Sequence, residues 1–168
     1  MNYDQEITHF LKDVFSHRIE AIIDISSRIV EDGCYIFPYM LKIRFEGVDR
    51  ESNPVGYNLY IHTKWRLVSS EGRILIADDD LFESVYYGKM KFLYFIRDWW
   101  KKNLPMNVDH YLFRRIGDLI IYFSNEDYLE VINGSSDENE IWRIVRDDNK
   151  RMFIVFGNGK IEIQESNE

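Results

Sequence analysis

Two pentads, "KWRLV" at Lys64–Val68 and "IWRIV" at Ile141–Val145, carry nearly the same residues 77 positions apart. Side chains alternate between the two faces of a β-strand, so each Trp shares a face with the Leu or Ile two residues later. The Arg between them points to the opposite face. We therefore interpret the two tryptophans as core anchors of two strands, in preference to a ligand-binding platform.

The segments around the two pentads follow one order. An alternating segment, a second β-rich segment, the pentad, a turn and a further β-rich segment succeed one another in each half. In the first half the flanking segments are "LKIRF" (41–45), "YNLYI" (57–61) and "RILIA" (73–77). In the second half they are "LIIYF" (119–123), "YLEVI" (128–132) and "RMFIVF" (151–156). The repeated order predicts two β-meanders of similar plan.

Three other segments complete the expected elements. Residues 4–15 place five apolar side chains on one helical stripe, which predicts an amphipathic helix. Residues 18–30 fit a helix or a strand, and their β-branched residues favour the strand. Residues 91–103 are apolar on nearly every face, and we keep a central helix and a crossover strand as alternatives.

Turn residues separate the segments of the second half. Asn158-Gly159 is a strong hairpin signal, and "SNED" at 124–127 predicts another hairpin turn. The predicted fold class is α+β, with an N-terminal helix followed by a mostly antiparallel sheet or two related sheets. We expect one domain over residues 1–164 and a flexible tail at 165–168.

The composition indicates a folded cytoplasmic protein. The chain has 168 residues, of which 45% are hydrophobic and 15% aromatic, enough to bury a core. Its one cysteine, Cys34, excludes an internal disulfide. The N-terminus does not show the pattern of a signal peptide. No apolar run approaches the roughly 18 residues of a membrane span, so we expect no membrane association.

Acidic residues provide the first candidate site. The formal net charge is −8, which disfavours general affinity for phosphate backbones. Two acidic segments stand out as candidate protein-binding loops, although solvated loop residues are the simpler interpretation. Their candidate residues are Asp78, Asp79, Asp80, Asp137, Glu138 and Glu140. Consecutive carboxylates of a strand alternate faces and cannot all bind one ion, so these residues do not predict a metal site.

A basic, aromatic segment provides the alternative candidate site. Between residues 87 and 115, seven basic residues stand against two acids. Aromatic rings there could stack on bases while the cations hold phosphates, which would suit a nucleic-acid or nucleotide binder. The candidate residues are Trp99, Trp100, Lys101, Lys102, Arg114 and Arg115. The other interpretations are a crossover segment with solvated lysines, and a patch that pairs with an acidic surface of a second copy.

Motifs of familiar enzymes do not occur in the chain. It contains no G-x-S-x-G, no P-loop, no G-x-G-x-x-G and no H-E-x-x-H. The sequence therefore predicts no cofactor and no metal, and it leaves open a small enzyme with an unrecognised site.

The segment 118–145, "DLIIYFSNEDYLEVING…ENEIWRIV", resembles a pattern in small uncharacterised bacterial proteins, some of which are similar to immunity proteins encoded beside polymorphic toxins. A fainter echo lies at 41–68. The resemblance carries no catalytic residues. It implies a single-domain, acidic, cytoplasmic binder that blocks a partner's active site. We therefore expect a non-enzymatic bacterial protein-binding module with a basic protein partner, and self-association is a further option.

Overall fold

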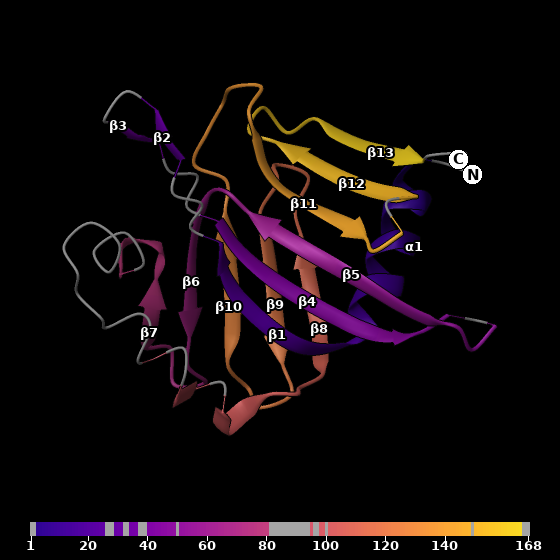
Figure 1. The fold of residues 1–168 in the computed structure, drawn as a ribbon, viewed down its shortest axis with the longest axis horizontal. Helices are drawn as coiled ribbons and strands as arrows, with labels where there is room; N and C mark the ends of the chain where they lie inside the picture. The colour runs from indigo at the N-terminus through magenta and orange to yellow at the C-terminus, as the bar shows by residue number, and fades with distance from the viewer. Residues whose placement is uncertain are drawn as a thin grey trace.

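A computed structural model of the chain describes residues 3–25, 29–31, 34–36, 40–49, 51–80, 95, 98–99, 101–148 and 150–165. It contains one N-terminal helix, α1 (Tyr3–Phe15), and two large sheets (Figure 1). Every pairing between the described strands is antiparallel. The expected α+β class is confirmed in this form, with the sheets as the dominant part.

The first sheet has six strands and the second has five. The six-stranded sheet is ordered β1 (Arg18–Ile25), β4 (Met40–Val48), β5 (Pro54–Ile61), β11 (Glu140–Arg146), β12 (Arg151–Phe156) and β13 (Ile161–Glu165). The five-stranded sheet is ordered β7 (Ile74–Ala77), β6 (Lys64–Val68), β10 (Tyr128–Ile132), β9 (Leu119–Phe123) and β8 (Val108–Phe113). A small separate hairpin joins β2 (Ile29–Glu31) to β3 (Cys34–Ile36).

The two pentads, β6 and most of β11, occupy equivalent positions in different sheets. Each half of the chain places three strands in one sheet and then crosses to the other. In the first half β1, β4 and β5 precede the crossing to β6 and β7. In the second half β8, β9 and β10 precede the crossing to β11 and β12. The halves interlock, because β5 pairs with β11 in one sheet and β6 pairs with β10 in the other.

The pairing registers of the two halves correspond residue by residue. Trp65 lies opposite Val131 in β10, and Leu67 lies opposite Leu129. In the other sheet Trp142 lies opposite Ile61, and Ile144 lies opposite Leu59. All eight side chains are buried. Both tryptophans therefore anchor the core, as the alternation predicts.

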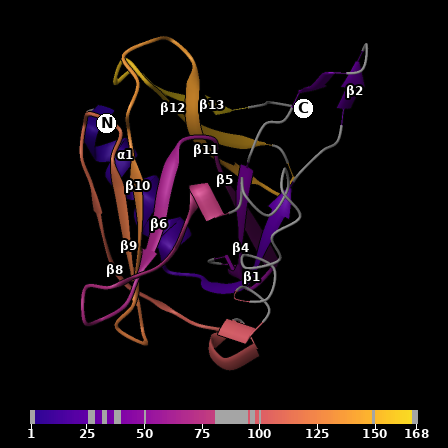
Figure 2. The ribbon, with the colours of Figure 1, turned by 90° about the vertical axis from the view of Figure 1, so that its left-hand side faces the viewer.

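The core lies between the two sheets, and α1 lies between them on one side (Figure 1, right; Figure 2). On the helix, Phe10 stacks on Phe153 of the six-stranded sheet at 5.4 Å between ring centroids. Phe15 contacts Phe45 of the same sheet and Tyr111 of the five-stranded sheet, with centroids at 5.6 and 4.7 Å. The stripe of apolar residues predicted for this helix thus faces both sheets.

Several element boundaries differ from the sequence-based prediction. The expected polar loop 48–56 shrinks to 49–53, because cross-strand hydrogen bonding extends β4 to Val48 and starts β5 at Pro54. Glu165, expected in a flexible tail, pairs with Arg151 at the end of β13, and 166–168 lie outside the described residues. Most of the central segment 91–103 also lies outside them, although 95, 98, 99 and 101–103 are helical.

Trp142 also carries a hydrogen bond between the sheets. Its indole Nε1 donates to the carbonyl oxygen of Gly117, in the turn between β8 and β9, at 2.7 Å. Its ring packs on Phe153 and edge-on against Phe113, with centroids at 5.5 and 5.7 Å. This single side chain thus connects the six-stranded sheet to the turn of the five-stranded one.

We expect Trp142→Phe to lower the free energy of unfolding by about 1–3 kcal/mol, because it leaves the carbonyl of Gly117 without its donor and opens a small cavity. Urea unfolding followed by tryptophan fluorescence and circular dichroism measures the change. An unaltered denaturant m-value would show that the fold is kept. A loss below about 0.5 kcal/mol would mean that the bond between the sheets contributes little to stability.

Candidate functional site

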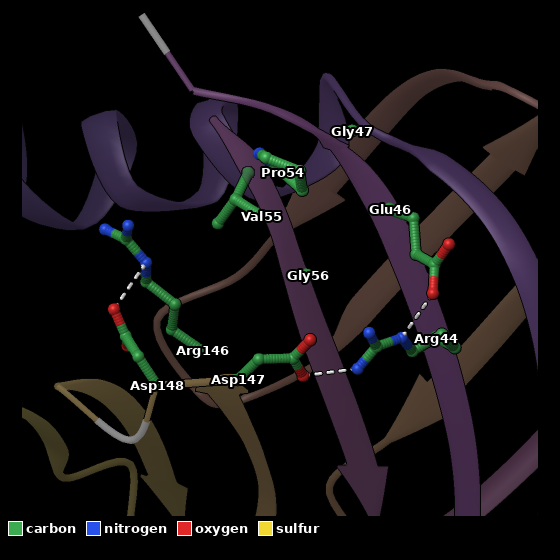
Figure 3. Close-up of a pocket in the computed structure, with 9 residues that line it drawn as sticks. All are labelled: Arg44, Glu46, Gly47, Pro54, Val55, Gly56, Arg146, Asp147 and Asp148. Carbon is green, nitrogen blue, oxygen red and sulfur yellow. Dashed lines mark hydrogen bonds and ion pairs between the residues drawn. The ribbon is translucent and has the colours of Figure 1, made fainter. Parts of the chain in front are cut away.

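A charged pocket of about 260 Å³ lies on the outer face of the six-stranded sheet (Figure 3). Arg44 of β4 and Asp147, after β11, form an ion pair across β5. Arg44 Nε also lies 3.0 Å from Glu46, and Asn58 donates to Asp147 Oδ1 at 2.7 Å. The residues that line the pocket are Arg44, Glu46, Gly47, Pro54, Val55, Gly56, Arg146, Asp147 and Asp148.

Gly56 makes room for the ion pair. A Cβ atom at this position would lie 2.4 Å from Asp147 Oδ2 and 2.7 Å from Arg44 Nη2. Both distances are too short for any non-bonded contact. An added methyl group would therefore displace the ends of the Arg44 and Asp147 side chains, which meet above Gly56.

Each charge in the pair stabilises the other. The hydrogen bond that Arg44 donates to Asp147 is the main cause that raises the pKa of Arg44 above its ordinary value. Burial works against ionisation of Asp147, but the hydrogen bonds and charge supplied by Arg44, together with Asn58, outweigh it and lower the pKa of the carboxyl group. The network holds β4, β5 and the β11–β12 turn together, and its cations and anions offset one another.

Gly56→Ala should displace Arg44 and Asp147 and lower the unfolding midpoint, because the methyl group takes the space in which this ion pair forms. Gly134→Ala is the matched control, since nothing lies within 4 Å of an added Cβ there. Thermal unfolding of both variants checks the prediction. Equal midpoints for Gly56→Ala and Gly134→Ala would contradict this role of Gly56.

The ion pair should also give the stability a pH dependence. Because folding lowers the pKa of Asp147, its contribution is present above the ordinary value of 3.8 and is lost as the pH falls through the lower, folded value. Asp147→Asn should therefore be less stable than the wild-type chain at pH 7, and the difference should shrink below about pH 4. Urea unfolding at pH 7, 5 and 3 measures it. A difference that is constant with pH would show that the charge of Asp147 is unimportant.

A second pocket, of about 380 Å³, lies where the chain crosses between the sheets. Both crossings are at the same end of the sandwich, and they touch: His62 N donates to the Ile141 carbonyl at 2.8 Å, and Thr63 Oγ1 donates to the Ile132 carbonyl at 2.9 Å. Residues of both crossings and of the segment after β7 line the pocket. They are His62, Thr63, Lys64, Trp65, Asp78, Asp79, Gly134 and Ser135.

Ion pairs organise the acidic residues around this second pocket. Lys64 Nζ lies 3.0 Å from Asp78 and 3.2 Å from Asp79. The hydrogen bonds that Lys64 donates to Asp78, and next to Asp79, raise the pKa of Lys64. Beside the pocket, His62 Nε2 lies 3.0 Å from Glu140 Oε1. These contacts link the two acidic segments through the connection between β5 and β6.

Glu140 is held by two cationic or hydrogen-bonding neighbours, His62 and Arg143. Arg143 Nη1 donates to its other carboxylate oxygen at 3.2 Å. Burial opposes its ionisation, but the hydrogen bond with His62 and the charge of Arg143 lower its pKa. Glu140 belongs to β11 rather than to the expected loop, because its backbone pairs with Phe156.

The other predicted acidic residues divide between structure and surface. Asp80 accepts a hydrogen bond from the Ala77 backbone at 3.1 Å, and 78–80 form a helical turn where a loop was expected. Asp137 Oδ1 accepts from the Asn139 backbone at 3.1 Å, which shapes the connection between β10 and β11. Glu138 and Asp79 are exposed. The structure thus brings all six predicted acids to one end of the sandwich, with different surroundings for each.

The described residues of the basic segment do not lie together at one place on the surface. Trp99 is only 9% exposed, and its Nε1 donates to Asp127 at 3.1 Å, so its ring is no free stacking surface. Lys101 and Lys102 are exposed before β8, whereas Arg114 and Arg115 follow it. The strand between them is about 17 Å long at roughly 3.4 Å per residue. Trp100 lies outside the described residues.

Arg114 and Arg115 are each paired with an acid. Arg114 lies 3.7 Å from Asp118, and Arg115 forms an ion pair with Asp4 of α1. These arginines therefore join neighbouring elements. The four described cations of the basic segment, Lys101, Lys102, Arg114 and Arg115, therefore lie in two places.

Sequence reasoning missed His62 and Lys64 as members of the acidic site. Lys64 is the first residue of the pentad at 64–68. Its proximity to the acids at 78 and 79 depends on the β6–β7 pairing. The charge pattern of a hairpin, with a cation on one strand and acids just past the end of the next, is the signal that could have found it.

Comparison with protein-family models, with curated proteins and with solved structures finds no match to this chain. Among the described residues, no three His, Cys, Asp or Glu side chains lie close enough to hold a metal ion. The part of the chain that the structure describes also has no helix of the length and hydrophobicity that a membrane span requires.

Proposed function

We propose that the protein is a non-enzymatic protein-binding module that receives a basic partner at the crossing end of the sandwich. The acidic crossing site consists of Asp78, Asp79, Asp80, Asp137, Glu138 and Glu140, together with His62 and Lys64. The observation that carries the proposal is the meeting of two acidic segments, distant in sequence, around the connection between β5 and β6.

The charges of the site suit a cationic protein surface. Lys64 and Arg143 offset only part of the charge of the six acids. The whole chain, with these residues included, has a net charge of −8. Such a field accelerates the encounter with a basic partner and repels anionic ones. A nucleic acid is therefore a poor ligand for this end of the molecule.

The pairing of the acids supports binding over catalysis. General acid–base chemistry uses carboxyl groups whose protonation states are pushed apart by their surroundings. Here Asp78, Asp79 and Glu140 are each paired with a cation, and the pKa of Glu140 is lowered. We therefore propose a fixed acidic surface, and an immunity-like role in which this surface covers the active site of a basic toxin domain.

The electrostatic part of the proposal is tested with a short arginine-rich peptide as the probe. We expect Asp79→Lys with Glu138→Lys to slow association by about 3–10-fold at low salt, because the attractive field is weakened where the partner docks. Glu51→Lys with Glu71→Lys is the matched control, with the same change in net charge on turns away from the site. Stopped-flow fluorescence over a salt series measures the rates.

Equal association rates for the two variants would contradict docking at the acidic crossing site, since net charge alone would then explain the attraction. The biological part is tested separately, by co-expression of the protein with the products of adjacent genes. Rescue of growth from a toxic product, and its loss in the Asp79→Lys, Glu138→Lys variant, would support the immunity-like role. Rescue that the variant retains would place the contact elsewhere.

A further inference from the structure

The outer face of the five-stranded sheet carries a row of aromatic rings. His110, Tyr122 and Tyr128 are cross-strand neighbours on β8, β9 and β10. The His110 and Tyr122 rings stack with their centroids 4.1 Å apart and an interplanar angle of 11°. The ring centroids of Tyr122 and Tyr128 lie 5.3 Å apart. No described element lies beyond this face in Figure 2, where it forms the left edge of the molecule.

Aliphatic side chains extend the row on both sides. Leu112 and Ile132 are 43% and 38% exposed, and Ile120 lies between Leu112 and Glu130 in the register of the sheet. We call the set of six residues the aromatic face: His110, Leu112, Ile120, Tyr122, Tyr128 and Ile132. Exposed apolar groups are common singly, whereas these six residues share one face of one sheet.

The equivalent outer positions of the six-stranded sheet can be compared with this surface. In the equivalent register of the six-stranded sheet, Lys42 stands in place of Ile120, Arg44 in place of Tyr122, and Asn58 in place of Tyr128. The same position in the same fold is thus polar or charged on one sheet and apolar or aromatic on the other. The fold itself does not demand an apolar residue at these three positions.

Charge distinguishes the aromatic face from the rest of the protein. Beside the aromatic rings, Arg66 and Glu130 form an ion pair across β6 and β10, and Asp109 lies 2.7 Å from His110. With His110 neutral, these groups sum to a formal charge of −1, on a chain of net charge −8. Two copies therefore repel each other less across this face than across the more acidic parts of their surfaces.

We propose that the aromatic face is a self-association surface, on which a second copy of this chain packs face to face about a two-fold axis. A two-fold interface must be complementary to itself. An uncharged aromatic centre meets this condition, and so does a flanking pair of opposite charges, since Arg66 of each copy can approach Glu130 of the other. Tyrosine and other aromatic residues are also enriched in protein–protein interfaces.

The size of the face sets the strength of the dimer. Four strands spaced at about 4.8 Å, and about five residues of 3.4 Å along each, give a footprint of roughly 300 Å². A standard interface buries about 800 Å² on each partner. The dimer should therefore be weak and dependent on concentration, and it leaves most of the acidic crossing site uncovered.

Sedimentation equilibrium of the full chain, from about 10 μM to about 1 mM, tests the proposal. The weight-average mass should rise above the 20.3 kDa of the monomer as concentration increases. Added salt should strengthen the association, because it screens repulsion between two acidic copies, whereas it weakens binding to a basic partner. Failure of this proposal therefore leaves the proposed function untouched.

Ile120→Lys with Tyr122→Arg is the decisive variant, because it copies the residues that the equivalent positions of the other sheet already carry. We expect it to weaken association by at least about tenfold. Glu51→Gln with Glu71→Gln, which adds the same two units of positive charge away from the face, should still associate. Circular dichroism and the unfolding midpoint verify the fold of each variant.

A charge swap at Arg66 and Glu130 tests the same dimer without changing the aromatic residues, so it does not require the sheet to fold with Lys and Arg at positions 120 and 122. Arg66→Glu should weaken the dimer, and Arg66→Glu combined with Glu130→Arg should restore it. A wild-type chain that stays monomeric up to about 1 mM would overturn the proposal. Association that persists unchanged in both the Ile120→Lys, Tyr122→Arg variant and the Arg66→Glu variant would overturn it as well.

Discussion

The double crossing of the chain between the two sheets is the constraint on which the rest of the structure depends. Neither half of the sequence can bury its apolar residues alone, because each half places its strands in both sheets and pairs them with the other half. The hydrophobic core forms only when β5 meets β11 and β6 meets β10. One tryptophan strand lies in each sheet and pairs there with a strand of the other half, and α1 lies between the sheets on one side.

The same constraint places the candidate sites. Because both crossings lie at one end, residues near position 62, near position 78 and near position 137 converge there, although they are far apart in the chain. The hydrophobic core is shared by the two halves, while the outer faces of the two sheets are free to differ. One outer face carries an offset network of charges around Gly56, and the other carries stacked aromatic rings.

The sequence predicted the acidic residues of the crossing site, but not their surroundings. Local charge density identified positions 78–80 and 137–140 without any structure. It did not show that Lys64 sits between Asp78 and Asp79, or that His62 meets Glu140, since those contacts span strands whose register is set by long-range pairing. Sequence also did not show that the described cations of the basic segment lie in two places, because a strand of extended backbone lies between Lys102 and Arg114.

The N-terminal helix, the alternation of buried and exposed side chains and the repeated order of strands around two tryptophans can be read from sequence, because they follow from the 3.6- and two-residue periods of local backbone geometry. The crossing of each half between two sheets, the pairing of acids with cations around a pocket, and the burial of Trp99 with its hydrogen bond to Asp127 required the folded structure. Those features depend on which strands pair across long stretches of chain, and a local pattern carries no information about a partner strand that it does not contain.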